Sequence, residues 1–255
     1  MAKKFGALAP LVVFSFVSSI TSLSAQELPP AEGPEAGRDL AALLRSMQPA
    51  ENAKWRGALK ISGRDQKTIS VPVLCETILG SNNWSVMYLA AATQTTAAEK
   101  LTVIFSTNAP NQYLYARAAT LDGPLGEPKS LTGAEADVPF AGSDFWLSDL
   151  GFEFYHWPDQ VRLPGQMRRS RPCYVLESIN SHPAPNAYLR VLTWVEKESA
   201  QPLQAEAYGA DKKLMKEFEL GSVEKVNGRY QIKDLKMFNR KTGSRTYLDF
   251  DLQSQ

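Results

Sequence analysis

The sequence is poor in the side chains that most often bind metals or act as nucleophiles. Among its 255 residues there are only two cysteines and two histidines. Cys75, Cys173, His156 and His182 lie far apart and show none of the short ligand spacings of a metal site. The sequence also lacks a G-x-S-x-G nucleophile elbow, an H-E-x-x-H pair and a Walker loop. We therefore expect no metal, no cofactor and no enzymatic activity.

Neither sign of charge is in excess. The chain has 28 Lys and Arg against 27 Asp and Glu, a formal net charge of +1. Such a balance gives no electrostatic reason to expect nucleic acid or an acidic membrane surface as a partner. What the composition does contain is an ordinary apolar fraction of 44%, which is enough for a sizeable hydrophobic core.

The first 25 residues are arranged as in a secretory signal peptide. Lys3 and Lys4 give a positive start, residues 5–20 form an apolar run, and small residues precede a cleavage point after Ala25. The alternative is a membrane anchor, but the run is shorter than the roughly 20 residues of a spanning helix. We expect residues 1–25 to be removed and the mature protein to be soluble outside the cytoplasm. No cysteine lies near the cleavage point, so we expect no lipid anchor.

Cys75 and Cys173 both lie in apolar, strand-like runs. An exported protein can join two cysteines in a disulfide, whereas two buried thiols would act as small hydrophobic side chains. The spacing along the sequence does not give their distance in space, so both alternatives stay open.

A linker and an amphipathic helix are expected next. Residues 26–35 are rich in proline and glutamate, which is typical of a linker. After them, apolar side chains recur at helical spacing from Leu40 to Met47, and Pro49 ends the pattern. The pattern predicts a helix of about three turns with one apolar face to bury.

From Lys54 to the C-terminus, strand patterns dominate. Apolar and polar residues alternate over short segments, and Gly, Asn or Asp residues mark the turns. The expected strands are residues 55–61, 69–75, 84–90, 101–107, 112–117, 171–178, 188–198, 202–208, 213–220, 230–239 and 245–252. Strands at such short spacing form an antiparallel meander, and a sheet of about ten strands tends to curl.

The fold class that follows is mainly β with helices (α+β), a curled antiparallel sheet with two helices on its concave face. Several strands are apolar on both faces, as where Met87 and Leu89 oppose Val86 and Tyr88, so both faces need cover. Two local details are a hairpin turn around residues 209–211 and a bulge between Ile232 and Leu235. Because no repeat and no second linker follow, we expect residues 36–255 to form a single domain.

The stretch Asp144–Trp157 is unusually rich in aromatic residues. Ser143 or Asp144 suits the start of a short apolar helix, and Gly151 suits its end. The second half, from Phe152, alternates like the start of the next strand. We interpret the helix as a lid over the concave face, with Gly151 as its hinge.

Aromatic and leucine side chains of the strands and of this helix are the candidate ligand-binding residues. The residues predicted to line or cover an apolar cavity are Trp84, Phe105, Tyr113, Tyr115, Phe145, Trp146 and Leu150. The alternative for each is a place in a filled hydrophobic core.

Two further groups near this stretch have two interpretations each. His156 lies close in sequence to Ser148, Asp144 and Asp159, so one interpretation is a hydrolytic Ser/His/Asp site. The other is that His156 is a polar residue at the mouth of the lid. The arginines at positions 162, 168, 169 and 171 either contact lipid headgroups or an acidic partner, or form the charged outer face of a strand pair with Pro164-Gly165 as its turn.

Four short motifs follow one another in a fixed order along the chain. They are Gly142-Ser143-Asp144-Phe145 with Ser148-Asp149-Leu150, Cys173–Glu177, Pro202–Tyr208 and Asn239–Thr246. Their order and spacing, over roughly residues 36–255, resemble the LolA/LolB-like periplasmic lipoprotein carrier superfamily, and more closely its outer membrane lipoprotein-sorting relatives. The resemblance implies an open β half-barrel closed by short helices over an apolar cavity.

The resemblance also implies a function. The expected protein is a periplasmic, non-enzymatic carrier that binds lipid or lipoprotein acyl chains and sorts them toward the outer membrane. Its partners would be an inner-membrane transport complex and an outer-membrane acceptor. The alternative is a binding or sensor module of the same fold that regulates a membrane protein.

Overall fold

A computed structural model describes residues 32–49, 51–65, 67–81, 83–226 and 229–251. The expected signal peptide and residues 26–31 of the expected linker lie outside the described residues. Among the residues described, no helix is both long enough and apolar enough to cross a membrane.

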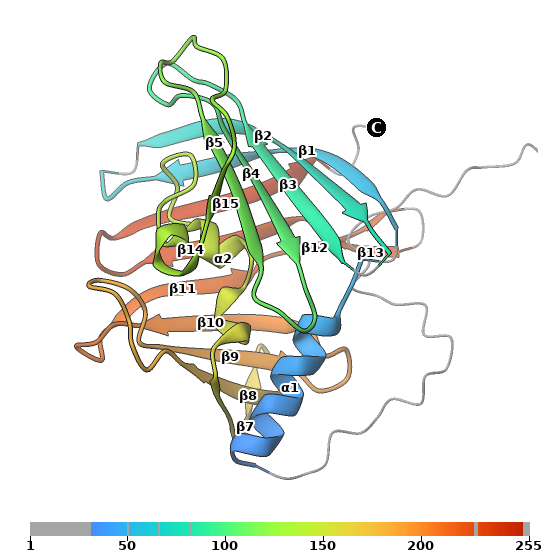
Figure 1. Cartoon of the computed structure of the whole chain (residues 1–255). Helices are drawn as coiled ribbons and strands as arrows, with labels where there is room; N and C mark the ends of the chain where they lie inside the picture. Colours follow the sequence, from blue (N-terminus) through green and yellow to red (C-terminus); the bar gives the residue numbers. More distant parts are fainter. Residues whose placement is uncertain (1–31, 50, 66, 82, 227–228, 252–255) are drawn as a thin grey trace, which may run out of the picture.

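One antiparallel sheet of 13 strands dominates the structure (Figure 1). Its strand order is β6-β5-β4-β3-β2-β1-β15-β14-β11-β10-β9-β8-β7. The bounds are β1 Ala53–Ser62, β2 Thr68–Leu79, β3 Trp84–Ala90, β4 Glu99–Phe105, β5 Gln112–Arg117, β6 Lys129–Leu131, β7 Asp159–Arg168, β8 Arg171–Ile179, β9 Arg190–Glu196, β10 Pro202–Tyr208, β11 Leu214–Leu220, β14 Asp234–Asn239 and β15 Ser244–Asp251. A separate hairpin pairs β12 (Val223–Val226) with β13 (Arg229–Ile232).

The sheet consists of two meanders joined by one long-range pairing. Strands β1–β6 follow one another in sequence, as do β7–β11, and β1 pairs with β15 so that Leu59 faces Leu248. The edge strands β6 and β7 are not paired with each other, so the sheet is not closed. The mainly β prediction is therefore confirmed, with more strands than were expected.

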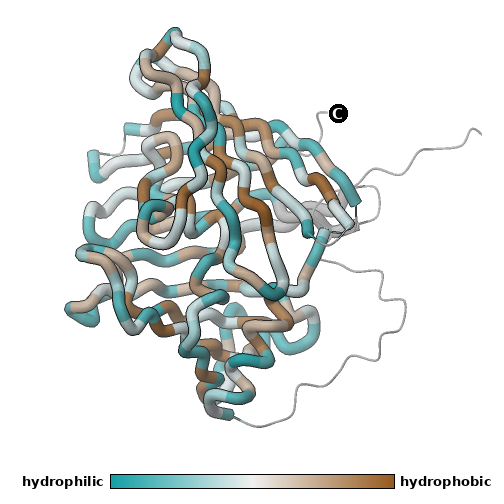
Figure 2. Tube along the Cα trace, viewed as in Figure 1, coloured by the Kyte–Doolittle hydropathy of each residue, from teal (hydrophilic) through white to brown (hydrophobic). Residues whose placement is uncertain are grey.

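The curved sheet in Figure 1 bends around α2 (Leu147–Leu150), and α1 (Pro34–Ser46) lies against β7 and β8 at one end. Apolar residues, brown in Figure 2, recur along the strands and along α1. On β3 one face is buried, with Trp84, Val86 and Tyr88 in the main core, while the other is half-buried. Phe145, Leu147 and Leu150 pack on the same core from the covering segment.

The amphipathic helix is confirmed, although α1 begins at Pro34 and so takes up the end of the expected linker. Leu40, Ala41 and Leu44 are buried in a second core cluster with β8, β9 and β10. Gly37 is required here because a Cβ atom would lie 2.5 Å from the Cα atom of Val161 on β7. A helix of ordinary side chains would stand farther from the sheet.

The predicted helix over Asp144–Gly151 is wrong in length. Only Leu147–Leu150 is α-helical, because the Asp149 carboxylate accepts from the Trp146 N–H (2.8 Å) and starts the helix there. Gly151 ends it as expected. The predicted strand from Phe152 is wrong as well. Phe152 has a left-handed φ of 50°, and the 3₁₀ helix η2 (Glu153–His156) follows it.

Three other local predictions have clear outcomes. The hairpin at 209–211 is confirmed between β10 and β11. The expected turn at Pro164-Gly165 is wrong: it is a bulge inside β7, and the turn lies at Arg169-Ser170, which both have positive φ. In place of a bulge between Ile232 and Leu235, the chain leaves the main sheet after β11 for the β12–β13 hairpin and returns at β14.

Both cysteine thiols are free and buried, Cys75 in the main core and Cys173 in a third cluster beside Trp194. The small-hydrophobe alternative therefore describes them.

Candidate functional site

An apolar cavity of about 110 Å³ lies between the sheet and the segments that cover its concave face. The sheet contributes Trp84, Val86, Tyr88, Phe105, Phe218, Leu220, Leu235 and Phe250 to its wall. Trp84 and Phe105 stack with their ring centroids 3.8 Å apart. Apolar groups thus form the floor from both meanders of the sheet.

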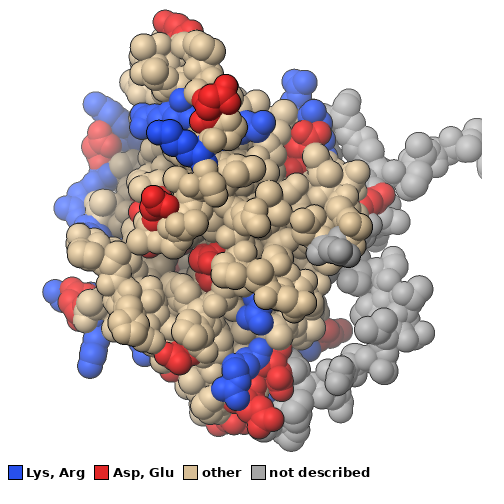
Figure 3. Space-filling view, in the orientation of Figure 1, with Lys and Arg blue, Asp and Glu red and all other residues tan. Residues whose placement is uncertain are grey.

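The cover of the cavity comes from two places in the sequence. The C-terminal end of α1 contributes Leu44, the residue that caps it contributes Met47, and the α2–η2 segment contributes Leu150, Phe152 and Tyr155. The ring of Phe152 meets that of Phe218 on β11 edge-on, with centroids 5.7 Å apart. In Figure 3 most charged side chains of the viewed face gather toward its margins.

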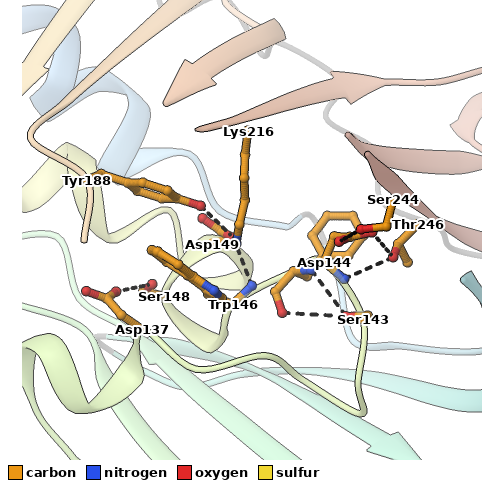
Figure 4. Close-up of polar contacts among 11 residues, drawn as sticks. Asp137, Ser143, Asp144, Trp146, Ser148, Asp149, Tyr188, Lys216, Ser244 and Thr246 are labelled. Carbon is orange, nitrogen blue, oxygen red and sulfur yellow. Dashed lines mark hydrogen bonds and ion pairs between the residues drawn. The ribbon is translucent and has the colours of Figure 1, made fainter. Parts of the chain in front are cut away.

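A buried ion pair attaches α2 to the sheet (Figure 4). Lys216 Nζ of β11 lies 3.1 Å from Asp149 Oδ2, and the side chains are only 5% and 6% exposed. Tyr188 OH donates to the same oxygen at 3.2 Å. The ammonium also lies 3.7 Å from the Trp146 ring centre. Burial lowers the pKa of Lys216, an effect that Asp149 opposes.

A second attachment joins the residues before α2 to β15. Thr246 Oγ1 donates to Asp144 Oδ2 (2.9 Å), and Ser244 Oγ donates to Oδ1 (2.5 Å). The Asp144 N–H in turn donates to Thr246 Oγ1 at 2.9 Å. The Asp144 side chain therefore binds the neighbouring strand instead of starting a helix.

A third attachment holds the segment after α2 to β5. Tyr113 OH donates to Glu153 Oε2 (2.8 Å), and Asn111 Nδ2 donates to the Gly151 carbonyl (2.7 Å). Burial raises the pKa of Glu153 to about 7, although the Tyr113 hydrogen bond opposes the rise. A Cβ atom at Gly151 would overlap the Tyr113 hydroxyl, so only glycine fits at this contact.

Arg45 connects both parts of the cover. Its Nη1 donates to the Tyr155 carbonyl (2.5 Å) and its Nε to the Thr107 carbonyl (3.3 Å). His156, the next residue of η2, also lines the cavity. Burial and the nearby Arg45 charge lower its pKa to about 4. The imidazole is therefore neutral at neutral pH.

The structure separates the predicted ligand-binding residues into two groups. Trp84, Phe105 and Leu150 line the cavity. The other four lie elsewhere: Phe145 is in the core, Tyr113 and Tyr115 lie on β5 with their hydroxyls near Glu153 and Glu99, and Trp146 stacks on Tyr188.

The imagined Ser/His/Asp site is not assembled. Ser148 Oγ donates to Asp137 (2.6 Å), Asp144 accepts from Thr246, and Asp159 accepts from Ser181 (2.6 Å). Among the described residues His156 shares no hydrogen bond with Ser148, Asp144 or Asp159. Burial raises the pKa of Asp137. The described residues also include no group of three or more His, Cys, Asp or Glu placed to hold a metal ion.

The four arginines after the aromatic stretch lie along the β7–β8 hairpin. Arg162 is buried. The other three each lie beside a carboxylate: Arg168 at 3.2 Å from Glu206, Arg169 at 3.6 Å from Glu219 and Arg171 at 2.8 Å from Glu196. This arrangement agrees with the charged face of a strand pair.

Three of the residues that attach the cover, Lys216, Arg45 and Tyr188, were not predicted from the sequence. The sequence pattern could have indicated Lys216, because alternation places it on the same face of β11 as Phe218 and Leu220. A charged side chain on an apolar face indicates a buried partner. No comparable sequence pattern marks Arg45 or Tyr188.

The comparisons with known proteins agree with the architecture. A family model described as an uncharacterized protein matches residues 89–253. A comparison with curated proteins gave no significant match. A solved DUF1329 family protein from Desulfovibrio piger has a TM-score of 0.67 at 16% identity, covering 88% of this chain and 96% of that one.

Two further solved structures share the fold. A domain named for outer membrane lipoprotein sorting, from Vibrio parahaemolyticus, has a TM-score of 0.66 at 16% identity, covering 87% and 94% of the two chains. A LolA superfamily protein from Nitrosomonas europaea has a TM-score of 0.57 at 16% identity, covering 87% and 92%. The chain belongs to the family of uncharacterized proteins whose model matches residues 89–253, and its fold is that of LolA-like proteins.

Proposed function

We propose that this protein is an exported, non-enzymatic carrier that binds lipid or lipoprotein acyl chains in the apolar cavity and sorts them toward the outer membrane. The observation that carries the proposal is the cavity itself, which has an apolar floor on the sheet and a cover attached by a few polar contacts. The fold relatives named for lipoprotein sorting support it. An inner-membrane complex and an outer-membrane acceptor would be its partners.

The apolar lining suits an acyl chain. Each methylene moved from water into such a lining contributes about 0.8 kcal/mol, without any need for directed hydrogen bonds. The wall offers side chains from both meanders and few polar groups, so it would accept chains of different length. In this proposal the unclosed sheet is an open half-barrel and the short helices are its lid.

The cavity must widen to receive a long chain. Sites for drug-sized ligands have volumes of about 300–1,000 Å³, whereas this cavity has about 110 Å³. The cover is the part that can move, because its attachments are individual contacts of Asp149, Asp144, Glu153 and Arg45 rather than a continuous strand ladder. Displacement of α2 and η2 would expose Phe218 and Phe250 to the incoming chain.

Lipid content and probe binding test the proposal together. The protein is purified after export from a bacterial host, and its extracted lipids are identified by mass spectrometry. N-phenyl-1-naphthylamine, a neutral probe that fluoresces in apolar sites, then reports the cavity in the delipidated protein. Ser106→Trp places a large side chain at the cavity wall, so we expect it to weaken probe binding at least tenfold.

Ser85→Trp is the matched control, because Ser85 is also half-buried but lies on the opposite face of β3 from Trp84. We expect it to bind the probe as the wild type does. Absence of co-purified lipid together with equal probe binding by both variants would show that the cavity is not an acyl-chain site.

A further inference from the structure

A second cavity, of about 390 Å³, adjoins the apolar one. It lies between α1, the loop over residues 107–110 after β4, and the segment that runs from η2 into β7, which contributes His156, Trp157, Pro158 and Gln160. Arg45 and His156 line both cavities. A molecule that occupied one could therefore extend into the other past these two side chains.

The lining of the second cavity is cationic. Arg38 and Arg45 contribute guanidinium groups, and among the described residues that line it there is no aspartate or glutamate. Arg38 is exposed and forms no ion pair or hydrogen bond with the described part of the chain. Arg45 uses Nε and Nη1 for two carbonyls, which leaves Nη2 to donate.

The neighbouring polar groups also suit an oxyanion. The half-buried ring of Trp157 and the exposed amide of Asn108 border the cavity, and each carries N–H donors. His156 is neutral at neutral pH because burial and Arg45 lower its pKa. An anion placed between His156 and Arg45 would favour the charged imidazole and raise that pKa.

We propose that the second cavity binds the anionic, phosphate-bearing headgroup of an amphiphile whose acyl chain occupies the apolar cavity. The inference rests on the proposed carrier function and specifies its cargo. A guanidinium donates charge-assisted hydrogen bonds to phosphate, two-pronged where both edges are free as at Arg38 and single from Nη2 of Arg45. The shared border at Arg45 and His156 joins headgroup to chain. A neutral acylglycerol would fill only the apolar part.

Calorimetric titration of two lipids with the same palmitoyl chain tests this. Palmitoyl lysophosphatidylglycerol is anionic and monopalmitoylglycerol is neutral, and both are used below their micelle concentrations with inorganic phosphate as a third ligand. We expect the anionic lipid to bind at least about tenfold more tightly, equivalent to about 1.4 kcal/mol. Arg38→Gln should remove most of this advantage without changing binding of the neutral lipid.

Arg56→Gln is the matched control, since Arg56 is an exposed arginine on β1 that lines neither cavity. It should keep the full preference for the anionic lipid. Proton NMR adds a direct readout, because the chain has only two histidines. The pKa of His156 should rise on adding the anionic lipid, whereas the ring-proton chemical shifts of the exposed His182 at fixed pH should not change.

The outcomes separate the two proposals. Equal binding of both lipids would overturn the headgroup site and leave the carrier function standing. Binding of inorganic phosphate with no binding of either lipid would overturn both the amphiphile and the carrier. Tighter binding of the anionic lipid that Arg38→Gln and Arg56→Gln leave unchanged would place the headgroup elsewhere and overturn the assignment to this cavity.

Discussion

The two ends of η2 should make opposite contributions to the pH dependence of stability. Glu153 opens the helix and His156 ends it. Burial raises the pKa of Glu153 from 4.5 to about 7 and lowers the pKa of His156 from 6.5 to about 4. Each group therefore titrates at a different pH in the folded and the unfolded chain, which couples its protonation to folding.

The signs follow from which state binds more protons. Between pH 4.5 and 7 the folded state holds more protons at Glu153, so this contribution is fully present below pH 4.5 and is lost as the pH rises through 7. Between pH 4 and 6.5 the unfolded state holds more protons at His156. That contribution is present above pH 6.5 and is lost as the pH falls through 4. In the wild type the two trends offset each other over their common range.

The magnitudes are similar. A difference of one in pKa corresponds to about 1.4 kcal/mol, so each group contributes at most about 3 kcal/mol. Both side chains are half-buried, and solvent screening reduces the effect, so we expect about 1–2 kcal/mol from each.

Single substitutions should reveal the two pH dependences of stability that offset each other in the wild type. In Glu153→Gln the free energy of unfolding, relative to wild type, should rise as the pH increases from 4.5 to 7, because the Glu153 contribution that declines over this range is removed. In His156→Gln the same difference should fall as the pH increases from 4 to 6.5, because the His156 contribution that grows over this range is removed. Urea unfolding followed by tryptophan fluorescence measures both at half-unit pH intervals, and the double variant is the control that should lack both trends.

Taking the difference from wild type removes the contributions of the other ionisable groups to the pH dependence. One of these groups is Asp137, whose pKa is also raised by burial. If the profiles of both single variants run parallel to that of the wild type, η2 does not bury these side chains and the reasoning is wrong.

Three shorter predictions concern the attachments of the cover. Lys216→Met leaves the Asp149 carboxylate buried without its cation, so it should lower the free energy of unfolding, measured with urea, by about 3–5 kcal/mol. Lys60→Met, which removes the cation of an exposed pair with Asp249, is the control and should lower it by at most about 1 kcal/mol. A loss of less than 1 kcal/mol for Lys216→Met would show that the pair is solvated. Gly151→Ala should cost about 1–3 kcal/mol, because its methyl group overlaps the Tyr113 hydroxyl, and Gly151→Ala with Tyr113→Phe should recover part of that loss when measured in the same way. Thr246→Val removes the donor to Asp144 and should lower the free energy of unfolding by about 1–3 kcal/mol. It should also speed hydrogen exchange of the Asp144 amide. An unchanged exchange rate would contradict the attachment.

The repeating patterns of the chain were predictable. The apolar spacing of α1, the alternation of β3 and β15 and the hairpin between β10 and β11 all appeared as expected. These features depend on neighbours within a few residues, where period and turn chemistry act directly.

The covering segment was predictable only in part. Its apolar character and its end at Gly151 were correct, but its helical length and the strand after Phe152 were wrong. Asp144 is suited to start a helix, and it binds instead to Thr246, 102 residues away. Long-range hydrogen bonds of this kind override local preference because they satisfy a buried carboxylate.

Local residue patterns were enough to predict that the protein is mainly β, that α1 is amphipathic and that an apolar segment needs the cover of a sheet. Which aromatic residues line a cavity, such as Trp84, and which fill the core, such as Phe145, depends on the tertiary arrangement. The same arrangement brings Lys216 to Asp149, 67 residues away, and pairs β1 with β15. Contacts between distant residues depend on how the two meanders join and curve, and no local period along the chain encodes that arrangement.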